Sequence, residues 1–209
     1  MAKFKKIVFR EKLSPSEIVV PGDTELTYIL FLTETPKKAE NKLNFTFPSP
    51  GANLNFFAFV LGKNSSKFNF ETISRHFSRL TTANYYIRSI LFDHSEVNYK
   101  GNLAIEKKGI LTNAYLSHHT LMLSPDCKTT SIPSLEIEAD DVKAGHSATI
   151  GQTDKDMLFY LQSRGLNLQE AEKLIVKAFM KVDLLKIKDL KLRHKIEKRI
   201  EESLKTVLK

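Results

Sequence analysis

The sequence predicts a mainly β fold followed by a small helical region, and two changes along the chain carry this prediction. Twelve of the 14 phenylalanines lie before residue 100, mostly in short runs where apolar and polar residues alternate. After about residue 150 the apolar residues recur at every third or fourth position instead. The 209 residues are 42 % hydrophobic and 27 % charged, a globular balance that excludes intrinsic disorder as the main state.

The alternating runs predict strands with one buried face each. They cover residues 43–47, 54–56, 68–71, 97–99 and 135–138. The first three runs begin 11 and 14 residues apart, and the runs are linked by Ser, Asn, Gly, Lys and Pro, without an Asn-Gly or Asp-Gly hairpin signal. This spacing fits a β-sandwich or a solenoid of strands, and periodicity alone does not choose between them.

The C-terminal region predicts three helices. The first begins with Asp154 or Asp156 as N-cap and ends at Gly165, which suits a left-handed C-cap. The second begins with Asn167 and Glu170, spaced as in a capping box. The third runs from about residue 188 to the end, with one apolar stripe made of Leu192, Ile196, Ile200, Leu204 and Val207. We therefore expect a β domain over 1–150 and a helical subdomain over 151–209.

The charge is concentrated in the predicted helices. The chain carries 32 basic and 24 acidic residues, a net charge of +8, of which residues 151–209 contribute +5. Such a surface fits an acidic protein partner or nucleic acid, or it is an ordinary solvated helix face supported by pairs such as Glu201 with Lys205. No arginine-rich run is interleaved with aromatic residues, so we expect no nucleic-acid binding.

The single cysteine, Cys127, excludes an internal disulfide framework and suits a reducing compartment. The first twelve residues are broken by charge throughout and do not resemble a signal peptide, so we expect a cytoplasmic protein. Residues 45–62 form an uncharged run, but two prolines and two asparagines interrupt it. We therefore expect no membrane span.

The motifs of common enzymes are absent, because the sequence has no phosphate-binding GxxxxGK[ST] loop, no GxGxxG, no HExxH and no GxSxG. His118 and His119 are adjacent, so on a strand at most one of them faces a given site. Cys127 and His146 are residue types that bind iron, yet the spacing between them shows no local ligand pattern. From the residues alone, Cys127 is better explained as a small apolar filler than as a ligand.

The segment 121–180 closely resembles the SufB/SufD family of iron–sulfur cluster assembly proteins. The most telling stretches are "PSLEIEADDVKAGHSATIGQ" and "LFYLQSRGL", and weaker similarity continues upstream through "FETISRHF" and "ILFDHSEVNYKGNLAIEKKG". The resemblance implies a right-handed parallel β-helix with a C-terminal α-helical subdomain, acting as a non-catalytic scaffold. It also implies pairing through the β-helix, as a homodimer or with a SufB-like paralogue, and docking of a SufC-like ABC ATPase by the helices.

The same resemblance assigns the candidate site. Cys127, in "CKTTSIP", matches a persulfide acceptor and cluster ligand of SufB-like members, and His146 matches a histidine of both branches. SufB-like proteins follow that histidine with a glutamate, whereas Ser147 stands here, and SufD-like proteins often carry a cysteine where Ala144 stands. The family implies a transient iron–sulfur cluster between paired subunits. We expect a thiol near His146 to have a lowered pKa.

Further expectations and alternatives follow from the family. Leu158, Tyr160, Leu174 and Phe179 are either ATPase contacts or core of the helical subdomain, and core is the better interpretation for most of them. Family members are about twice as long, and the start at Met1 suggests a naturally short member.

One alternative is a SufD-like structural partner that never binds the cluster. Another is a polysaccharide-acting β-helix enzyme, which needs clustered acids on a groove, whereas the adjacent Asp140 and Asp141 are expected to diverge.

Overall fold

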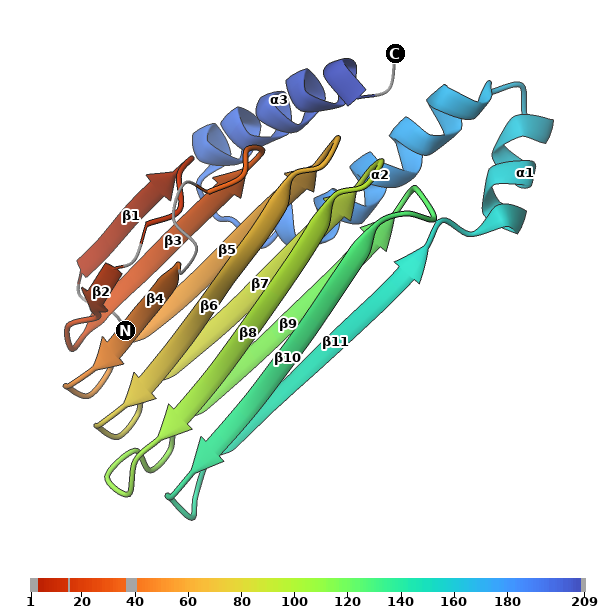
Figure 1. Cartoon of the computed structure of the whole chain (residues 1–209). Helices are drawn as coiled ribbons and strands as arrows, with labels where there is room; N and C mark the ends of the chain where they lie inside the picture. The colour runs from red at the N-terminus through yellow and green to blue at the C-terminus, as the bar shows by residue number, and fades with distance from the viewer. Residues whose placement is uncertain (1–3, 15, 37–40, 208–209) are drawn as a thin grey trace.

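The computed structural model describes residues 4–14, 16–36 and 41–207, without the side chain of Val207. Two parallel sheets face each other along the length of the β region (Figure 1). One sheet, called sheet A, contains β1 (Phe4–Arg10), β3 (Thr24–Leu32), β5 (Asn53–Gly62), β7 (Thr82–Leu91), β9 (Asn113–Met122) and β11 (Lys143–Gln152). The other, called sheet B, contains β2 (Ser16–Val19), β4 (Lys42–Phe47), β6 (Lys67–His76), β8 (Glu96–Ile105) and β10 (Lys128–Ile137).

The chain alternates between the two sheets and so winds a right-handed parallel β-helix, as Figure 1 shows. Along sheet A, Asn53 pairs with Thr82, Thr82 with Asn113, and Asn113 with Lys143. Each coil is therefore about 30 residues long. This arrangement decides between the two architectures that periodicity left open: the fold is a solenoid and not a sandwich.

The main core lies between the sheets, where alternate side chains of each strand point inward. In β6, Phe68 and Phe70 are buried while Lys67 and Asn69 are exposed. Aromatic rings contact one another inside the solenoid: Phe45 and Phe56 meet edge to face with ring centroids 5.6 Å apart, and the rings of Phe56 and Tyr85 are tilted with centroids 5.3 Å apart. All five predicted strands are confirmed, in β4, β5, β6, β8 and β10, although β10 ends at Ile137, one residue before the predicted end of the fifth run.

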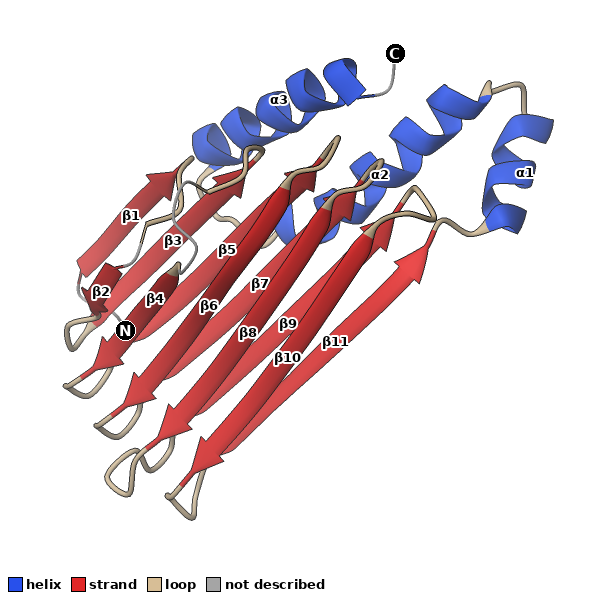
Figure 2. Cartoon of the chain, viewed as in Figure 1, coloured by secondary structure: helices blue, strands red, loops and turns tan. Residues whose placement is uncertain are grey.

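A second core lies on the outer face of sheet A, where two helices cover it (Figure 2). The helices of the chain are α1 (Lys155–Ser163), α2 (Leu168–Leu184) and α3 (Leu190–Val207). Buried residues of α2 and α3 pack on outward-facing residues of β3, β5, β7 and β9. They include Val176, Met180, Ile196, Ile200 and Leu204 on the helices and Ile29, Phe57, Phe59 and Ile90 on the strands. The first four members of the predicted α3 stripe belong to this core or border it, and the side chain of Val207 lies outside the described part.

The helix boundaries follow the predicted capping signals. Asp154 caps α1, accepting hydrogen bonds from the backbone N–H groups of Asp156 and Met157. Gly165 follows that helix with a φ of 96°, a left-handed conformation that glycine tolerates. Asn167 and Glu170 form the capping box of α2.

The uncharged run 45–62 does not form a helix. It provides the end of β4, a turn and the whole of β5, whose side chains are buried on both faces in its second half. Among the described residues, no helix has the length and apolar character needed to cross a membrane.

Candidate functional site at the open end of the solenoid

The last coil of the β-helix ends in two strand edges with no neighbour. β11 is hydrogen-bonded only to β9, and β10 only to β8, within the described part of the chain. Each strand therefore presents a row of free backbone N–H and C=O groups over ten residues. An exposed edge of this length is a ready surface for pairing with another chain.

His146 lies in the middle of β11, on its inner side. It stands in register with Leu116 of β9, whose side chain is part of the solenoid core. Because no sheet B strand follows β11 in the described chain, this inward position is uncovered and His146 is exposed. The open end of the solenoid therefore presents an imidazole from what would otherwise be a core position.

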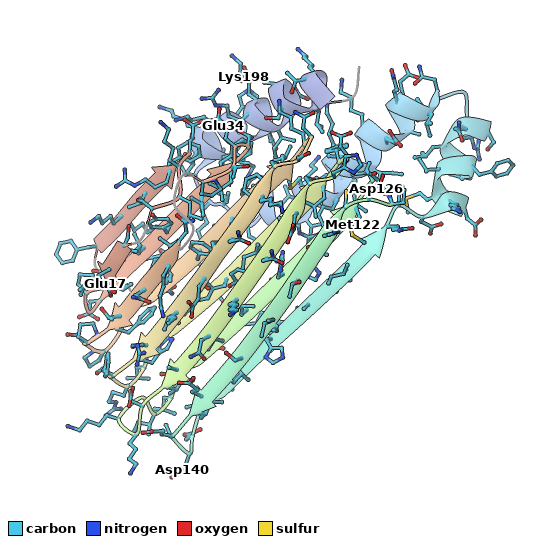
Figure 3. All side chains as sticks on the ribbon, in the orientation of Figure 1. Glu17, Glu34, Met122, Asp126, Asp140 and Lys198 are labelled. Carbon is cyan, nitrogen blue, oxygen red and sulfur yellow. The ribbon has the colours of Figure 1, made fainter. Side chains whose placement is uncertain are left out.

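Cys127 lies in the turn before β10, at the coil end close to the helices; the neighbouring Asp126 is labelled in Figure 3. Its side chain is 8 % exposed, and the thiol donates a hydrogen bond to the carbonyl of Asp93 at 3.5 Å. Burial raises the pKa of the Cys127 thiol. The expected lowering of this pKa is therefore wrong for a single chain, because the thiol is desolvated and no histidine offsets the effect.

Cys127 and His146 of one chain do not share a site. Hydrogen bonds across the interior place His118 opposite Ser131, and Thr120 opposite Thr129. By the same pairing, Cys127 lies at the level of Met122 in β9. Met122 is in register with Gln152 of β11, which lies six residues beyond His146. At about 3.3 Å per residue the two lie roughly 20 Å apart along the strands. A site containing both residue types therefore requires two chains.

The adjacent histidines point to opposite faces, as expected. His118 is buried inside the solenoid, where it bonds Ser89 and Ser131, and burial lowers its pKa to about 3. His119 lies half-buried on the outer face of sheet A. Among the described residues, no group of three or more histidines, cysteines, aspartates and glutamates is placed to hold a metal ion.

The four docking candidates have different environments. Tyr160 and Leu174 are 54 % and 47 % exposed, whereas Leu158 and Phe179 are half-buried. Phe179 borders the second core, and the guanidinium of Arg88 lies 4.6 Å from its ring centroid. We expected most of these four residues to belong to the core of the helical subdomain. This expectation holds only in part, because none of the four is fully buried.

The helices also expose apolar surface that the sequence interpretation did not single out. Helix α1 buries no residue fully, and Phe159 is 73 % exposed next to Tyr160. A groove of about 480 Å³ runs between α2 and α3, with Leu174, Met180 and Ile200 among its apolar lining. Lys177 and Glu201 form an ion pair of 2.5 Å across this groove. Large exposed apolar side chains on a helix are typical of a partner-binding surface.

A buried ion pair behind these helices was missed as well. Asp183 of α2 accepts a hydrogen bond of 2.6 Å from Nε of Arg88 in β7, and one of 2.5 Å from Nζ of Lys186. The sequence does contain a signal for this ion pair, because an acidic residue in the last turn of a helix is unfavourable next to the negative end of the helix dipole and needs a basic partner.

The fold and its open end define the class: a right-handed parallel β-helix capped on one face by C-terminal helices. The family model described as "SUF system FeS cluster assembly, SufBD core domain" matches residues 22–179. This chain therefore belongs to the SufBD family of iron–sulfur cluster assembly proteins.

Curated relatives agree with this membership. The chain is 32 % identical to the iron-sulfur cluster assembly protein SufD of Escherichia coli over 117 residues, which is 56 % of this chain and 28 % of that protein. It is 33 % identical to SufD of Bacillus subtilis over 121 residues, or 58 % of this chain and 28 % of the relative. A SufBD family protein of Synechocystis is 37 % identical over 92 residues, or 44 % and 20 %. The matched region thus spans less than a third of the length of these relatives.

Proposed function

We propose that this chain is a non-catalytic scaffold subunit for iron–sulfur cluster assembly. It pairs through the open end of its β-helix and helps to hold iron and sulfide between the paired chains. It docks a SufC-like ABC ATPase through residues 151–209, and that partner supplies the nucleotide hydrolysis. The single free cysteine suits a reducing compartment, and we place the protein in the cytoplasm. The observation that carries the proposal is the uncovered end of a SufBD-family solenoid with His146 exposed on it.

Pairing supplies the ligands that one chain lacks. A cluster is usually held by about four protein ligands, mostly thiolates, whereas each chain offers one cysteine and His146. A homodimer doubles both groups, and a heterodimer with a SufB-like paralogue adds the ligands of the second chain. The separation of roughly 20 Å within one chain favours a cysteine from one subunit acting with a histidine from the other.

The ligand assignment predicts a loss of cluster binding in two variants. Anaerobic reconstitution with ferrous iron and sulfide, in the presence of the pairing partner if one is required, should give visible absorbance and bound iron. Cys127→Ser and His146→Ala should each lower both by at least about tenfold, because each removes a ligand type of which the chain has a single candidate.

His194→Ala is the matched control, since that histidine is exposed on α3 and should leave both readouts unchanged. The mass of each variant, measured by light scattering, shows whether pairing survives. Full cluster absorbance in both Cys127→Ser and His146→Ala would contradict a ligand role.

A second candidate function is a SufD-like structural partner that does not bind the cluster. It is favoured by the burial of Cys127 and by its raised pKa, because iron binds the thiolate and not the thiol. The reconstitution experiment separates the two functions: a structural partner keeps its pairing and ATPase docking while neither Cys127 nor His146 affects iron content.

The docking assignment predicts that Phe159→Ser with Tyr160→Ser reduces co-purification of the ATPase by at least about tenfold, since exposed aromatic residues dominate binding energies. Truncation of α3 is a poorer test, because Ile196, Ile200 and Leu204 cover the outer face of sheet A and their loss would expose the second core. Val19→Ser is the control, as Val19 is an exposed apolar residue of β2, outside the helices and at the end of sheet B away from β10. Unchanged ATPase recovery in the double variant, with folding intact, would rule out α1 as the contact.

A further inference from the structure

Sheet A has a second free edge, at the N-terminal end of the solenoid. Within the described residues β1 is hydrogen-bonded only to β3, and it is the outermost strand of sheet A in Figure 1. The N–H of Phe4 donates to the carbonyl of Asp23, so the backbone groups of Phe4 point toward β3. Because these groups point to alternate sides along a strand, the N–H and C=O groups of Lys5, Ile7 and Phe9 point away from β3 and have no partner in the described chain.

The charged side chains of β1 are all basic. Lys6 and Arg10 lie on the inner side of the strand, in register with core residues of β3, and Lys5 lies on the outer side. The free edge of β11 differs, because Lys143 is its single charged residue in ten positions. One end of sheet A is therefore nearly neutral, whereas the other is positive on both faces.

Helix α3 adds positive charge along the outer side of β1. Nζ of Lys195 lies 4.4 Å from the ring centroid of Phe9, so the helix runs beside the strand. Lys191 and Lys198 are spaced four and three residues from Lys195 and so lie on the same side of α3; Lys198 is labelled in Figure 3. The acidic Glu201 lies on another side of the helix, where it pairs with α2.

These cations are exposed and have no carboxylate partner within the described residues. Glu25 is in register with Lys5 but pairs with Lys188 at 3.0 Å, and Glu11 pairs with Arg199 at 2.7 Å. The neighbouring acids are thus used by other cations. The free edge of β1 together with its unpaired cations is here called the basic edge, and its cations are Lys5, Lys6, Arg10, Lys191, Lys195 and Lys198.

We propose that the basic edge binds an extended acidic peptide segment of another protein. The segment adds a strand to sheet A, so that its backbone pairs with Lys5, Ile7 and Phe9 and its carboxylates meet the cations on both faces. A second copy of the basic edge is repelled, because it carries charges of the same sign. The site lies away from β10, β11 and α1, so it depends neither on the proposed pairing nor on the proposed ATPase docking.

The backbone groups favour a peptide over the phosphates of a nucleic acid or of an anionic membrane. The carbonyls of Lys5, Ile7 and Phe9 need hydrogen-bond donors, whereas a phosphate diester at neutral pH offers only acceptors. A peptide strand offers donors and acceptors at the spacing of β1, and glutamate or aspartate side chains supply the negative charge. An acidic strand therefore satisfies both features of the basic edge.

A fluorescently labelled peptide tests the proposal. It has blocked ends, alternates glutamate with valine and is about ten residues long, the length of a typical strand or slightly more. Anisotropy should show binding, and the same peptide with every backbone nitrogen methylated should bind at least about tenfold more weakly, because it keeps the charge but cannot donate to the edge. In hydrogen exchange, the unmethylated peptide should slow the amides of Lys5, Ile7 and Phe9.

Variants separate strand pairing from charge. Ile7→Pro removes the central donor of the edge without removing a bond to β3 and should raise the dissociation constant by about tenfold, whereas Ile7→Thr keeps the donor and should not. Lys5→Glu with Lys6→Glu should raise it by at least about tenfold at low salt. Lys107→Glu with Lys108→Glu, two exposed lysines in the loop after β8, is the matched control and should leave binding unchanged.

Several outcomes would overturn the proposal. Equal affinity for the methylated and unmethylated peptides, or peptide binding without slower exchange at Ile7, would show that charge alone attracts the peptide. Binding to phosphatidylserine vesicles or to duplex DNA, but not to the peptide, would identify a different partner. Binding to no probe would mean that the lysines only prevent the edge from pairing. If Ile7→Pro does not fold, the exchange of the unchanged chain decides the question.

Discussion

The substitution Asp183→Asn is expected to lower the free energy of unfolding by about 3–5 kcal/mol, because it breaks a buried ion pair and leaves a charge without its partner. Asp183 is 1 % exposed and lies between Arg88 and Lys186. Burial alone would raise the pKa of Asp183, but hydrogen bonds from Lys186 and Arg88 and their charges lower it instead. Equilibrium unfolding in urea at pH 7, followed by circular dichroism, measures the effect.

The position of this pair determines which part of the molecule should loosen. Arg88 belongs to β7 of sheet A and Asp183 to α2, so the pair joins the helical layer to the solenoid. Arg88 also lies over Phe179, and Lys186 lies 4.0 Å from the ring centroid of Tyr86. In hydrogen exchange, the amides of α2 and α3 should lose protection in Asp183→Asn before those inside β6 and β8.

Glu201→Gln is the matched control, because it breaks the exposed Lys177–Glu201 pair between α2 and α3. Exposed ion pairs contribute little, so its unfolding curve should stay close to that of the unchanged chain. Replacing both Arg88 and Asp183 with apolar residues of similar size should recover part of the lost stability, since no buried charge then remains unpaired. Equal losses in the free energy of unfolding for Asp183→Asn and Glu201→Gln would show that the buried pair stabilises the fold no more than the exposed pair does.

The burial of the two sheets explains which strands could be predicted from the sequence. Sheet B has one face toward the core and one toward solvent, so β4, β6, β8 and β10 alternate and were recognised, whereas the four-residue β2 of the same sheet was not. Sheet A is covered on its outer face by α2 and α3, and in β3 and β5 consecutive residues are buried, which removes the alternation. Only β5 of that sheet was recognised, from its first half. Helix caps, by contrast, depend on local residues and were predicted correctly.

The candidate site was less accessible to sequence reasoning. Neither Cys127 nor His146 has a local partner in the sequence, and in the structure Cys127 lies in the turn before β10 while His146 lies in the middle of β11, at a different level. The exposure of His146 depends on a missing neighbour strand, which is a property of the whole topology. The positive φ of Leu80 and Leu111 was hidden for another reason: positive φ is usually signalled by glycine or asparagine, and here leucine occupies both positions.

Acid is expected to destabilise the fold well above the range where carboxylates titrate, because two histidines are held neutral inside the solenoid. His76 bonds Ser74 and Thr81 at 2.8 Å each, and burial lowers its pKa to about 3. Burial, with a smaller contribution from the charge of His119, lowers the pKa of His118 to about 3 as well. Both values lie well below the ordinary value of 6.5 that applies to the unfolded chain.

The sign follows from which state binds more protons. Between pH 6.5 and about 3 the unfolded chain protonates both imidazoles while the folded chain protonates neither, so the free energy of unfolding falls as pH falls. Each histidine contributes about 1.4 kcal/mol per pH unit at full slope, so the pair should cost about 4 kcal/mol between pH 7 and pH 5. Asp183 acts in the same direction, but its stabilisation is lost only around and below its unfolded pKa, at about pH 4.

Urea unfolding at pH 7, 6 and 5 tests this linkage, and a substitution isolates one histidine. His118→Gln should reduce the pH slope to about half, because one of the two linked protons is removed even if the variant is less stable at pH 7. His194→Gln removes an exposed histidine of α3 and should leave the slope unchanged. A slope that is the same in His118→Gln and in the unchanged chain would mean that His118 is protonated equally in the folded and unfolded states, which is incompatible with its buried bonds to Ser89 and Ser131.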